Sequence, residues 1–303
     1  MEQPLPTPQN FGSTGGQGPI PLLDMPPRPT PFSIVWLSDT QLMSYQRYPG
    51  RMAEMGQWIA AEQEGKNILY VVQTGDAVEN GFSDWQWEEF DTLYNEFRGR
   101  IPFLAIAGNH DVGIQQKSYE AFLKREYIAE IPSERAYDHG RAAYARFTAG
   151  GMKFIILGAG WFTEIEATPW MNEVLRRYSD HVAILLFHGY IAENGRYTIV
   201  GKSMFENVVK PNPNVRLVLC GHVCGTGFRA EDIDDTGDGA PDRRVNAMLY
   251  NYQLETIDSG QLRLLTFDPF THGLTVMTYS PPLDRYFRDY NFASANFTID
   301  GAF

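Results

Sequence analysis

The chain has 303 residues and a formal net charge of −12 at pH 7, a length that suits one large α/β domain with a sizeable core. Proteins that bind nucleic acid or anionic membranes non-specifically use basic surfaces to displace counterions from phosphate. The acidic balance argues against that class, so we expect no stable nucleic-acid partner. No apolar stretch reaches transmembrane length, so we also expect no membrane span.

The first 31 residues differ in composition from the rest. They are rich in Pro, Gly, Gln and Thr and carry almost no charge, which predicts a disordered leader over 1–31 followed by a single catalytic domain over 32–303. The basic and apolar regions of a signal peptide are not found here, and the two cysteines do not fix the compartment. The leader suits either a cytoplasmic protein with a loose arm or an exported protein whose signal has been removed. By analogy, we favour the second.

From residue 32 onward, apolar runs typical of buried strands alternate with amphipathic helical patterns. In chain order we expect a strand at 33–37, a helix at 52–65, a strand at 68–72, a helix at 85–97, a strand at 101–107, a helical unit at 119–127, a strand at 153–157, a helix at 170–178, a strand at 182–187, a helix at 202–209 and a strand at 215–220. Only strands are expected after that, at 245–252, 261–267 and 274–279. Their alternating pattern is typical of half-buried antiparallel strands.

Several of these strands end in residue types that bind metals. The residues that follow them are Asp39, Thr40 and Gln41; Gly75 and Asp76; Gly108, Asn109, His110 and Asp111; His188; and Gly221 and His222. Because the carboxyl ends of strands in an α/β sheet gather at one edge, we expect these side chains to converge although they are far apart in the sequence. The pattern therefore predicts a metal site built from loops.

This order of motifs resembles the calcineurin-like metallophosphoesterases over nearly all of residues 32–281. The resemblance implies an α/β fold, a four-layer α/β/β/α sandwich of two mixed β-sheets flanked by helices. It also implies one or two divalent transition metals, which would be zinc, manganese or iron. In the family's arrangement Asp76 bridges the two metal positions, Asn109, His188 and His222 complete one of them, and Asp39 belongs to the other.

The resemblance also implies a catalytic pair. His110 would lie near the leaving group, and Asp111 would be the carboxylate that orients it. The chemistry expected of the whole site is hydrolysis of a phosphoester bond by metal-activated water, with His110 assisting the leaving group.

Two residues depart from the family's usual motifs, and both fall on the same metal position. Gln41 stands where the first block commonly has histidine, and Cys224 stands where the last block commonly has histidine. A glutamine carbonyl is a weak, hard ligand and a thiolate is a soft one. The second metal would therefore bind weakly, bind as zinc through Cys224, or be missing. Cys224 as a mere space-filling residue stays open, and for Gln41 we favour a hydrogen bond to a water at the metal.

An acidic run at 232–242 resembles the front half of a calcium loop. The oxygen ligands would be Asp234, Thr236, Asp238 and Asp242. The closing glutamate is absent, because position 245 is valine. If calcium binds, we expect it to stiffen this loop near the metal-site end of the sheet. The alternative is a solvated acidic hairpin between two strands.

Three further residues are candidates for substrate contacts. Trp161, with Phe162 beside it, follows the strand at 153–157 and would either line the cleft or cover the core, while Tyr190 and Arg196 come shortly after His188. A guanidinium there would steady a phosphate oxygen. Weakening one metal position lowers the charge available to a doubly anionic monoester, so we expect the substrate to be a small phosphodiester or another singly charged ester. The alternative is a degenerate family member that binds a phosphorylated ligand or a partner without turnover.

Overall fold

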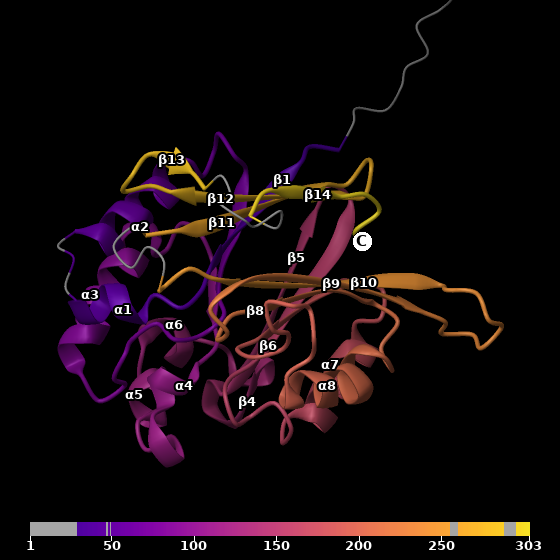
Figure 1. The fold of residues 1–303 in the computed structure, drawn as a ribbon, viewed down its shortest axis with the longest axis horizontal. Coiled ribbons are helices and arrows are strands. Elements are labelled where there is room, and N and C mark those ends of the chain that lie inside the picture. The colour runs from indigo at the N-terminus through magenta and orange to yellow at the C-terminus, as the bar shows by residue number, and fades with distance from the viewer. Residues whose placement is uncertain (1–28, 47, 49, 255–259, 288–294) are drawn as a thin grey trace, which may run out of the picture.

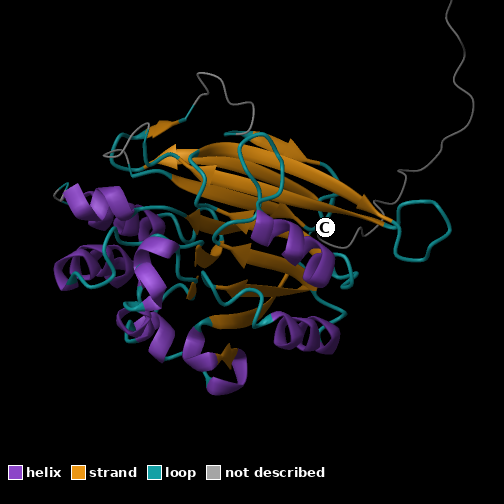
Figure 2. Cartoon of the chain, turned by 60° about the horizontal axis from the view of Figure 1, so that its bottom comes forward, coloured by secondary structure: helices purple, strands orange, loops and turns teal. Residues whose placement is uncertain are grey.

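A computed structural model describes residues 29–46, 48, 50–254, 260–287 and 295–303 of the chain. Two mixed β-sheets pack face to face, and helices cover their outer faces (Figures 1 and 2). This confirms the four-layer α/β/β/α sandwich. Residues 1–28 of the expected leader lie outside the described residues. Within the described ranges, no helix combines the length and the apolar character needed to cross a membrane.

The first sheet has the strand order β13-β12-β11-β1-β2-β3, with β14 paired to β12. Its strands are β1 (Phe32–Leu37), β2 (Ile68–Gln73), β3 (Phe103–Ala105), β11 (Leu262–Asp268), β12 (Gly273–Ser280), β13 (Arg285–Tyr286) and β14 (Phe297–Ile299). The strands β1, β2 and β3 run parallel, and β11 runs antiparallel to β1. The carboxyl ends of β1, β2 and β3 therefore lie at one edge of the sheet.

The second sheet has the order β4-β5-β6-β7-β8-β10-β9. Its strands are β4 (Ala136–Tyr137), β5 (Ala142–Ala149), β6 (Met152–Ala159), β7 (Val182–Phe187), β8 (Val215–Cys220), β9 (Gly225–Ile233) and β10 (Arg243–Asn251). Strands β6, β7, β8 and β10 are parallel, and β9 runs antiparallel to β10. The loops after β6, β7 and β8 therefore share one edge.

Helices close both outer faces. The first sheet is covered by α1 (Gln41–Gln46), α2 (Arg51–Ala61), α3 (Asp84–Phe97), α4 (Asn109–Val112), α5 (Tyr119–Leu123) and α6 (Glu126–Ala129). The second sheet is covered by α7 (Thr168–Arg177), α8 (Ile199–Met204) and the π-helical turn η4 (Phe205–Val209) that continues it. Short 3-10 turns η1 (Ile114–Gln116), η2 (Ser133–Arg135) and η3 (Asp138–Gly140) lie in the loops between these elements.

Both faces of β1 are buried, which explains why its sequence is apolar throughout. Val35 and Leu37 pack against α2 and α3, whereas Ile34 and Trp36 pack against the second sheet. Successive side chains of a strand point to opposite faces, so a strand buried on both sides cannot alternate with polar residues. The apolar sequence of β1 therefore indicates that its sheet is covered on both faces, by helices on one side and by the second sheet on the other.

Several expected boundaries were wrong. The helix expected at 52–65 ends at Ala61, before its glycine, and the unit at 119–127 is two short helices. The helix expected at 202–209 begins at Ile199. Strands β4, β5, β9, β13 and β14 were not expected. Strand β9 contains two glycines and several charged residues, so its sequence lacks the apolar alternation, and its pairing with β10 holds it in place.

Candidate metal centre

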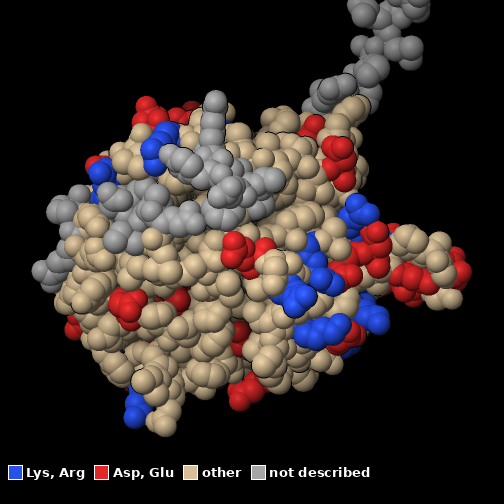
Figure 3. Space-filling model, in the orientation of Figure 1, with Lys and Arg blue, Asp and Glu red and all other residues tan. Residues whose placement is uncertain are grey.

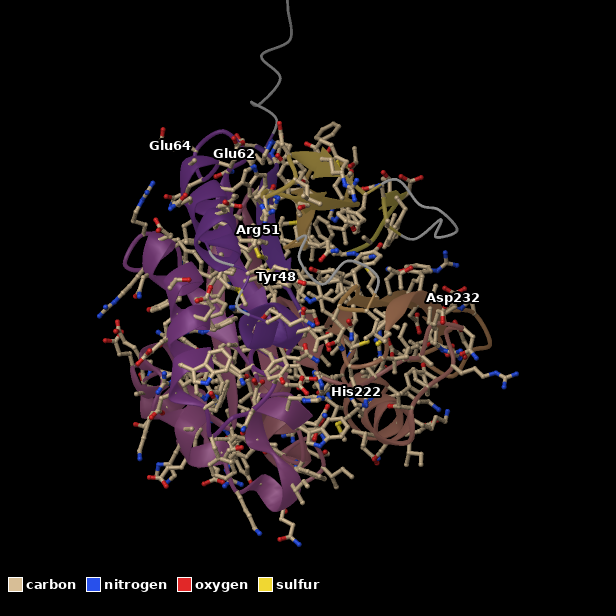
Figure 4. All side chains as sticks on the ribbon, turned by 60° about the vertical axis from the view of Figure 1, so that its left-hand side comes forward. Tyr48, Arg51, Glu62, Glu64, His222 and Asp232 are labelled. Atoms are coloured by element: carbon tan, nitrogen blue, oxygen red, sulfur yellow. The ribbon has the colours of Figure 1, made fainter. Side chains whose placement is uncertain are left out.

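Three side chains expected to bind metal come together at the shared edge. Asp76 follows β2, His188 follows β7 and His222 follows β8, and one ligand atom from each lies within 4.8 Å of the others. His188 Nε2 lies 3.2 Å from Asp76 Oδ2 and 3.0 Å from Asn109 Oδ1. Figure 4 shows His222 where the indigo and magenta half of the chain meets the orange strands. The two sheets thus each contribute part of one site.

The backbone turns sharply at this edge. Asp39, Asp76 and His222 all have positive φ, at 51°, 54° and 71°, a conformation that costs energy for residues other than glycine and clusters at functional sites. The neighbouring glycines are required by close approach. A side chain at Gly108 would overlap the carboxylate of Asp76, and one at Gly221 would overlap that of Asp39. This explains why glycine precedes the ligand residues in both motifs.

Local hydrogen bonds hold the ligand groups in place. His188 Nδ1 lies 2.8 Å from the carbonyl oxygen of Thr74, which leaves Nε2 directed to Asp76 and Asn109. Asp76 Oδ1 accepts a hydrogen bond from the backbone N–H of His110 at 2.9 Å. Such supporting contacts fix the orientation and the tautomer of a ligating histidine.

The electrostatics of the cluster suit a cation. Burial disfavours a charged His188, but the adjacent Asp76 carboxylate overrides burial and raises the pKa of His188 to about 10. Burial raises the pKa of Asp39 to about 8, and burial together with the nearby His188 lowers the pKa of His222 to about 4. Although burial opposes it, the adjacent His188 lowers the pKa of the buried Asp76 carboxylate, which therefore stabilises a positive charge at this place. Imidazole, carboxylate and amide oxygen donors together fit a divalent transition metal.

The second metal position is built differently. Gln41, at the start of α1, donates from Nε2 to Asp76 Oδ2 at 3.3 Å, and its Oε1 is buried without a hydrogen-bond partner among the described residues. Asp39 accepts hydrogen bonds from the backbone N–H of His222 at 3.1 and 3.2 Å. Cys224 is half-buried, and its Sγ lies 3.9 Å from Gln253 Nε2. In the described part of the chain, neither Asp39 nor Cys224 joins the group of Asp76, His188 and His222.

The expected pairing of His110 with Asp111 is not found. Both carboxylate oxygens of Asp111 accept backbone hydrogen bonds, from Val78 at 3.0 Å and from Gly108 at 2.8 Å. Consecutive residues of a helix point in different directions, so Asp111 turns into the core while His110 stays at the surface. His110 Nδ1 instead lies 3.2 Å from both the carbonyl oxygen and a carboxylate oxygen of Glu79.

Glu79 was therefore missed by the sequence reasoning. Its position three residues after Asp76, on the same loop, was the available signal. Asp111 has a structural function in this geometry, because it ties the Gly108 turn to the loop that follows β2.

The three residues expected to contact substrate lie in different parts of the structure. The Trp161 ring lies against both imidazoles, with centroid distances of 4.7 Å to His222 and 5.5 Å to His188. Arg196 is exposed on the loop between β7 and α8. Tyr190 is only 1 % exposed and stacks on Phe187 in the core beneath the second sheet. The expectation that Tyr190 contacts substrate was wrong, because its side chain points away from the cleft into that core.

The acidic run lies at the far end of the second sheet. Strand β9 carries the chain away from His222 along the whole length of β10, so the loop at 234–242 forms the tip of the protruding hairpin in Figure 1. Acidic and basic side chains gather over this hairpin in Figure 3. The expectation that the loop lies near the metal-site end was wrong, because β9 was not foreseen.

The loop is closed by its own backbone. Asp234 accepts hydrogen bonds from the N–H groups of Gly237 and Gly239, and Asp242 accepts from those of Asp235 and Thr236. Asp238 accepts from Ala240. The carboxylates thus already serve as acceptors for the turn.

Comparisons with known proteins agree with this geometry. A family model described as calcineurin-like phosphoesterase matches residues 32–225. The uncharacterized protein YvnB of Bacillus subtilis (strain 168) is 37% identical over 277 residues, which are 89% of this chain and 21% of that protein. The chain therefore spans about one fifth of the length of that relative. A probable cyclic nucleotide phosphodiesterase of Moraxella catarrhalis (strain BBH18) is 28% identical over 214 residues, covering 63% of this chain and 71% of that protein.

Two solved structures share the fold. A purple acid phosphatase from yellow lupin (Lupinus luteus) seeds superposes with a TM-score of 0.58 at 16% identity, covering 91% of this chain and 55% of that one. GAP50, the anchor in the inner membrane complex of Plasmodium, superposes with a TM-score of 0.54 at 11% identity, covering 85% of this chain and 87% of that one. At these identities the likeness concerns the fold alone.

Proposed function

This chain belongs to the calcineurin-like phosphoesterase family, and from that membership we propose that it hydrolyses small phosphodiesters. The observation that carries the proposal is the group of Asp76, His188 and His222 at the shared edge of the two sheets, with Asn109 beside it. These donors come from different loops. Asp76 and His188 are buried while Asn109 and His222 are half-buried, an arrangement that the packing of the core does not explain.

We assign Asp76, Asn109, His188 and His222 as the residues that would hold a divalent zinc, manganese or iron ion. Such an ion would supply positive charge for the phosphoryl oxygens and would lower the pKa of the attacking water. The chain's own part is to hold these donors rigidly, which it does through the hydrogen bonds of His188 to Thr74 and of Asp76 to the backbone of His110.

His110 is placed to assist the leaving group. Its Nδ1 faces Glu79, so Nε2 is the ring nitrogen left to donate a proton to the departing alkoxide. Glu79 acts through His110 and is a positioning residue, because its contacts fix which nitrogen faces outward. Asp111 keeps the Gly108 turn in place from within the core.

The diester preference rests on the second metal position. Gln41 stands where the family commonly has an imidazole ligand, and its amide, which already hydrogen-bonds to Asp76, is a weaker ligand for a transition metal, so the second metal would be held weakly. A site with less positive charge favours a singly charged diester over a doubly charged monoester. The relative described as a probable cyclic nucleotide phosphodiesterase supports the same preference.

The test compares two aryl esters with the same leaving group. Purified protein with added manganese or zinc should hydrolyse bis(p-nitrophenyl) phosphate faster than p-nitrophenyl phosphate. Asp76→Asn, which keeps the side-chain shape but removes the charge, should abolish both reactions, whereas Asp180→Asn, at an exposed site, is the matched control. If wild type hydrolyses these esters no faster than Asp76→Asn does, the site does not catalyse the reaction, and the protein would instead be a binding module. Faster monoester hydrolysis would contradict the diester preference.

A further inference from the structure

The loop after β6 presents an aromatic side chain in a strained conformation. Phe162 has a φ of 67° and its side chain is 52% exposed. A bulky residue in the left-handed region is an outlier that costs about 1–2 kcal/mol. Among the described residues its ring contact is with Trp161, so little of the side chain is used in packing and the conformation points to a functional reason.

Aromatic rings connect Phe162 to the candidate metal ligands. The rings of Phe162 and Trp161 meet edge-on at 5.6 Å, and the Trp161 ring in turn lies 4.7 Å from that of His222. Phe162 is therefore the solvent-exposed end of a row of rings that begins at the metal centre. A group attached to a phosphorus atom held at the centre would extend along this row.

The loop is held firmly enough to keep Phe162 in place. The backbone N–H of Trp161 donates to the carbonyl oxygen of Ala107 at 2.9 Å, which ties the loop to the Gly108 turn. Thr163 Oγ1 lies 3.2 Å from the hydroxyl of Tyr119. Glu164, the residue that follows, is buried with 2% exposure. A rigid surface of this kind loses little entropy when a ligand binds.

Exposed apolar side chains follow several of the strands that end at the same edge. Phe82 follows β2, Ile114 of η1 follows β3, Phe162 and Ile165 follow β6, and Ile199, the first residue of α8, follows β7. Exposed apolar groups on the segments beside a polar centre are typical of a binding site for an apolar group. The edge thus combines a cation site in its interior with an apolar rim.

We propose that Phe162 is the surface on which a planar aromatic group of the phosphodiester substrate stacks. The inference rests on the proposed function and narrows its substrate class to diesters that carry an aromatic or heteroaromatic group. Stacking is favoured over general hydrophobic contact because the strained position carries an aromatic ring. Glycine would avoid the strain, and an aliphatic residue would bear the same strain without offering a ring face.

The binding test uses unreactive diesters with one negative charge each. Diphenyl phosphate, dibutyl phosphate and dimethyl phosphate are titrated by calorimetry into the metal-loaded protein. Phe162→Asn removes the ring while suiting a left-handed backbone, and it should weaken diphenyl phosphate binding about tenfold and change dimethyl phosphate binding less than about twofold. Phe162→Tyr should retain the wild-type affinity. Phe270→Ala, an exposed aromatic at the opposite end of the first sheet, is the control.

Each result has a defined meaning. An equal loss for dibutyl and diphenyl phosphate, or no loss with Phe162→Asn, would overturn the stacking proposal. The melting temperature of Phe162→Asn should equal or exceed that of wild type, because asparagine suits a left-handed backbone, and this separates lost binding from misfolding. Turnover of bis(p-nitrophenyl) phosphate is measured on the same samples. If the protein turns over the diester but Phe162→Asn binds diphenyl phosphate as wild type does, only the stacking inference fails. If Phe162→Asn weakens diphenyl phosphate binding but the protein shows no turnover, only the proposed function fails.

Discussion

Glu164 should make the stability of this protein depend on pH. Its side chain is 2% exposed, and its Oε1 has no hydrogen-bond partner among the described residues. Burial raises the pKa of Glu164 to about 7 from an ordinary value of 4.5, although nearby backbone N–H groups and His188 oppose the change. Between pH 4.5 and 7 the folded state therefore binds more protons than the unfolded chain. The contribution of Glu164 to stability falls as pH rises through this window and is constant above it.

The size of the effect follows from the two pKa values. At about 1.4 kcal/mol per pKa unit, ionising the buried Glu164 costs about 3 kcal/mol of folding free energy. Glu164→Gln keeps the shape of the side chain and cannot ionise. The free energy of unfolding of Glu164→Gln minus that of wild type should therefore be about 3 kcal/mol larger at pH 8 than at pH 4.5.

The assay is urea unfolding followed by circular dichroism at pH 4.5 and pH 8. Taking the difference between wild type and Glu164→Gln at each pH cancels the titration of every other group. Glu166→Gln, an exposed position two residues further on, is the matched control. If the difference in unfolding free energy between wild type and Glu164→Gln is the same at both pH values, the buried carboxyl does not titrate as argued.

Three further outcomes test the site. His188→Ala and His222→Ala should each lose bound metal in elemental analysis, and full metal content in both would mean that the centre lies elsewhere. His110→Ala should lower turnover by about 10²–10⁴-fold with metal content unchanged, and the loss should shrink for esters with good leaving groups; an equal loss on all esters would remove His110 from the leaving-group role. Gln41→His combined with Cys224→His should raise metal content from about one toward about two per chain and increase monoester hydrolysis, whereas a natural protein that already binds two metals tightly would refute a weakened second position.

The sequence alone determined the layers of the fold and the edge that holds the site. Strands such as 33–37 and 182–187 are apolar throughout, and only burial on both faces explains that pattern. Ligand residue types after each strand then had to meet, because parallel strands end at the same edge. Asp76, His188 and His222 were predicted for this reason, and the structure brings them together.

Only the tertiary structure decided which side chains touch. Glu79 rather than Asp111 faces His110, because the direction of a side chain on a short helix depends on how that helix packs. Tyr190 turned into the core, and β9 carried the acidic loop away from the site through pairing with a partner strand that local sequence does not reveal. Residue type and spacing follow from the chain itself, whereas contacts between distant segments depend on the packing of all the layers at once.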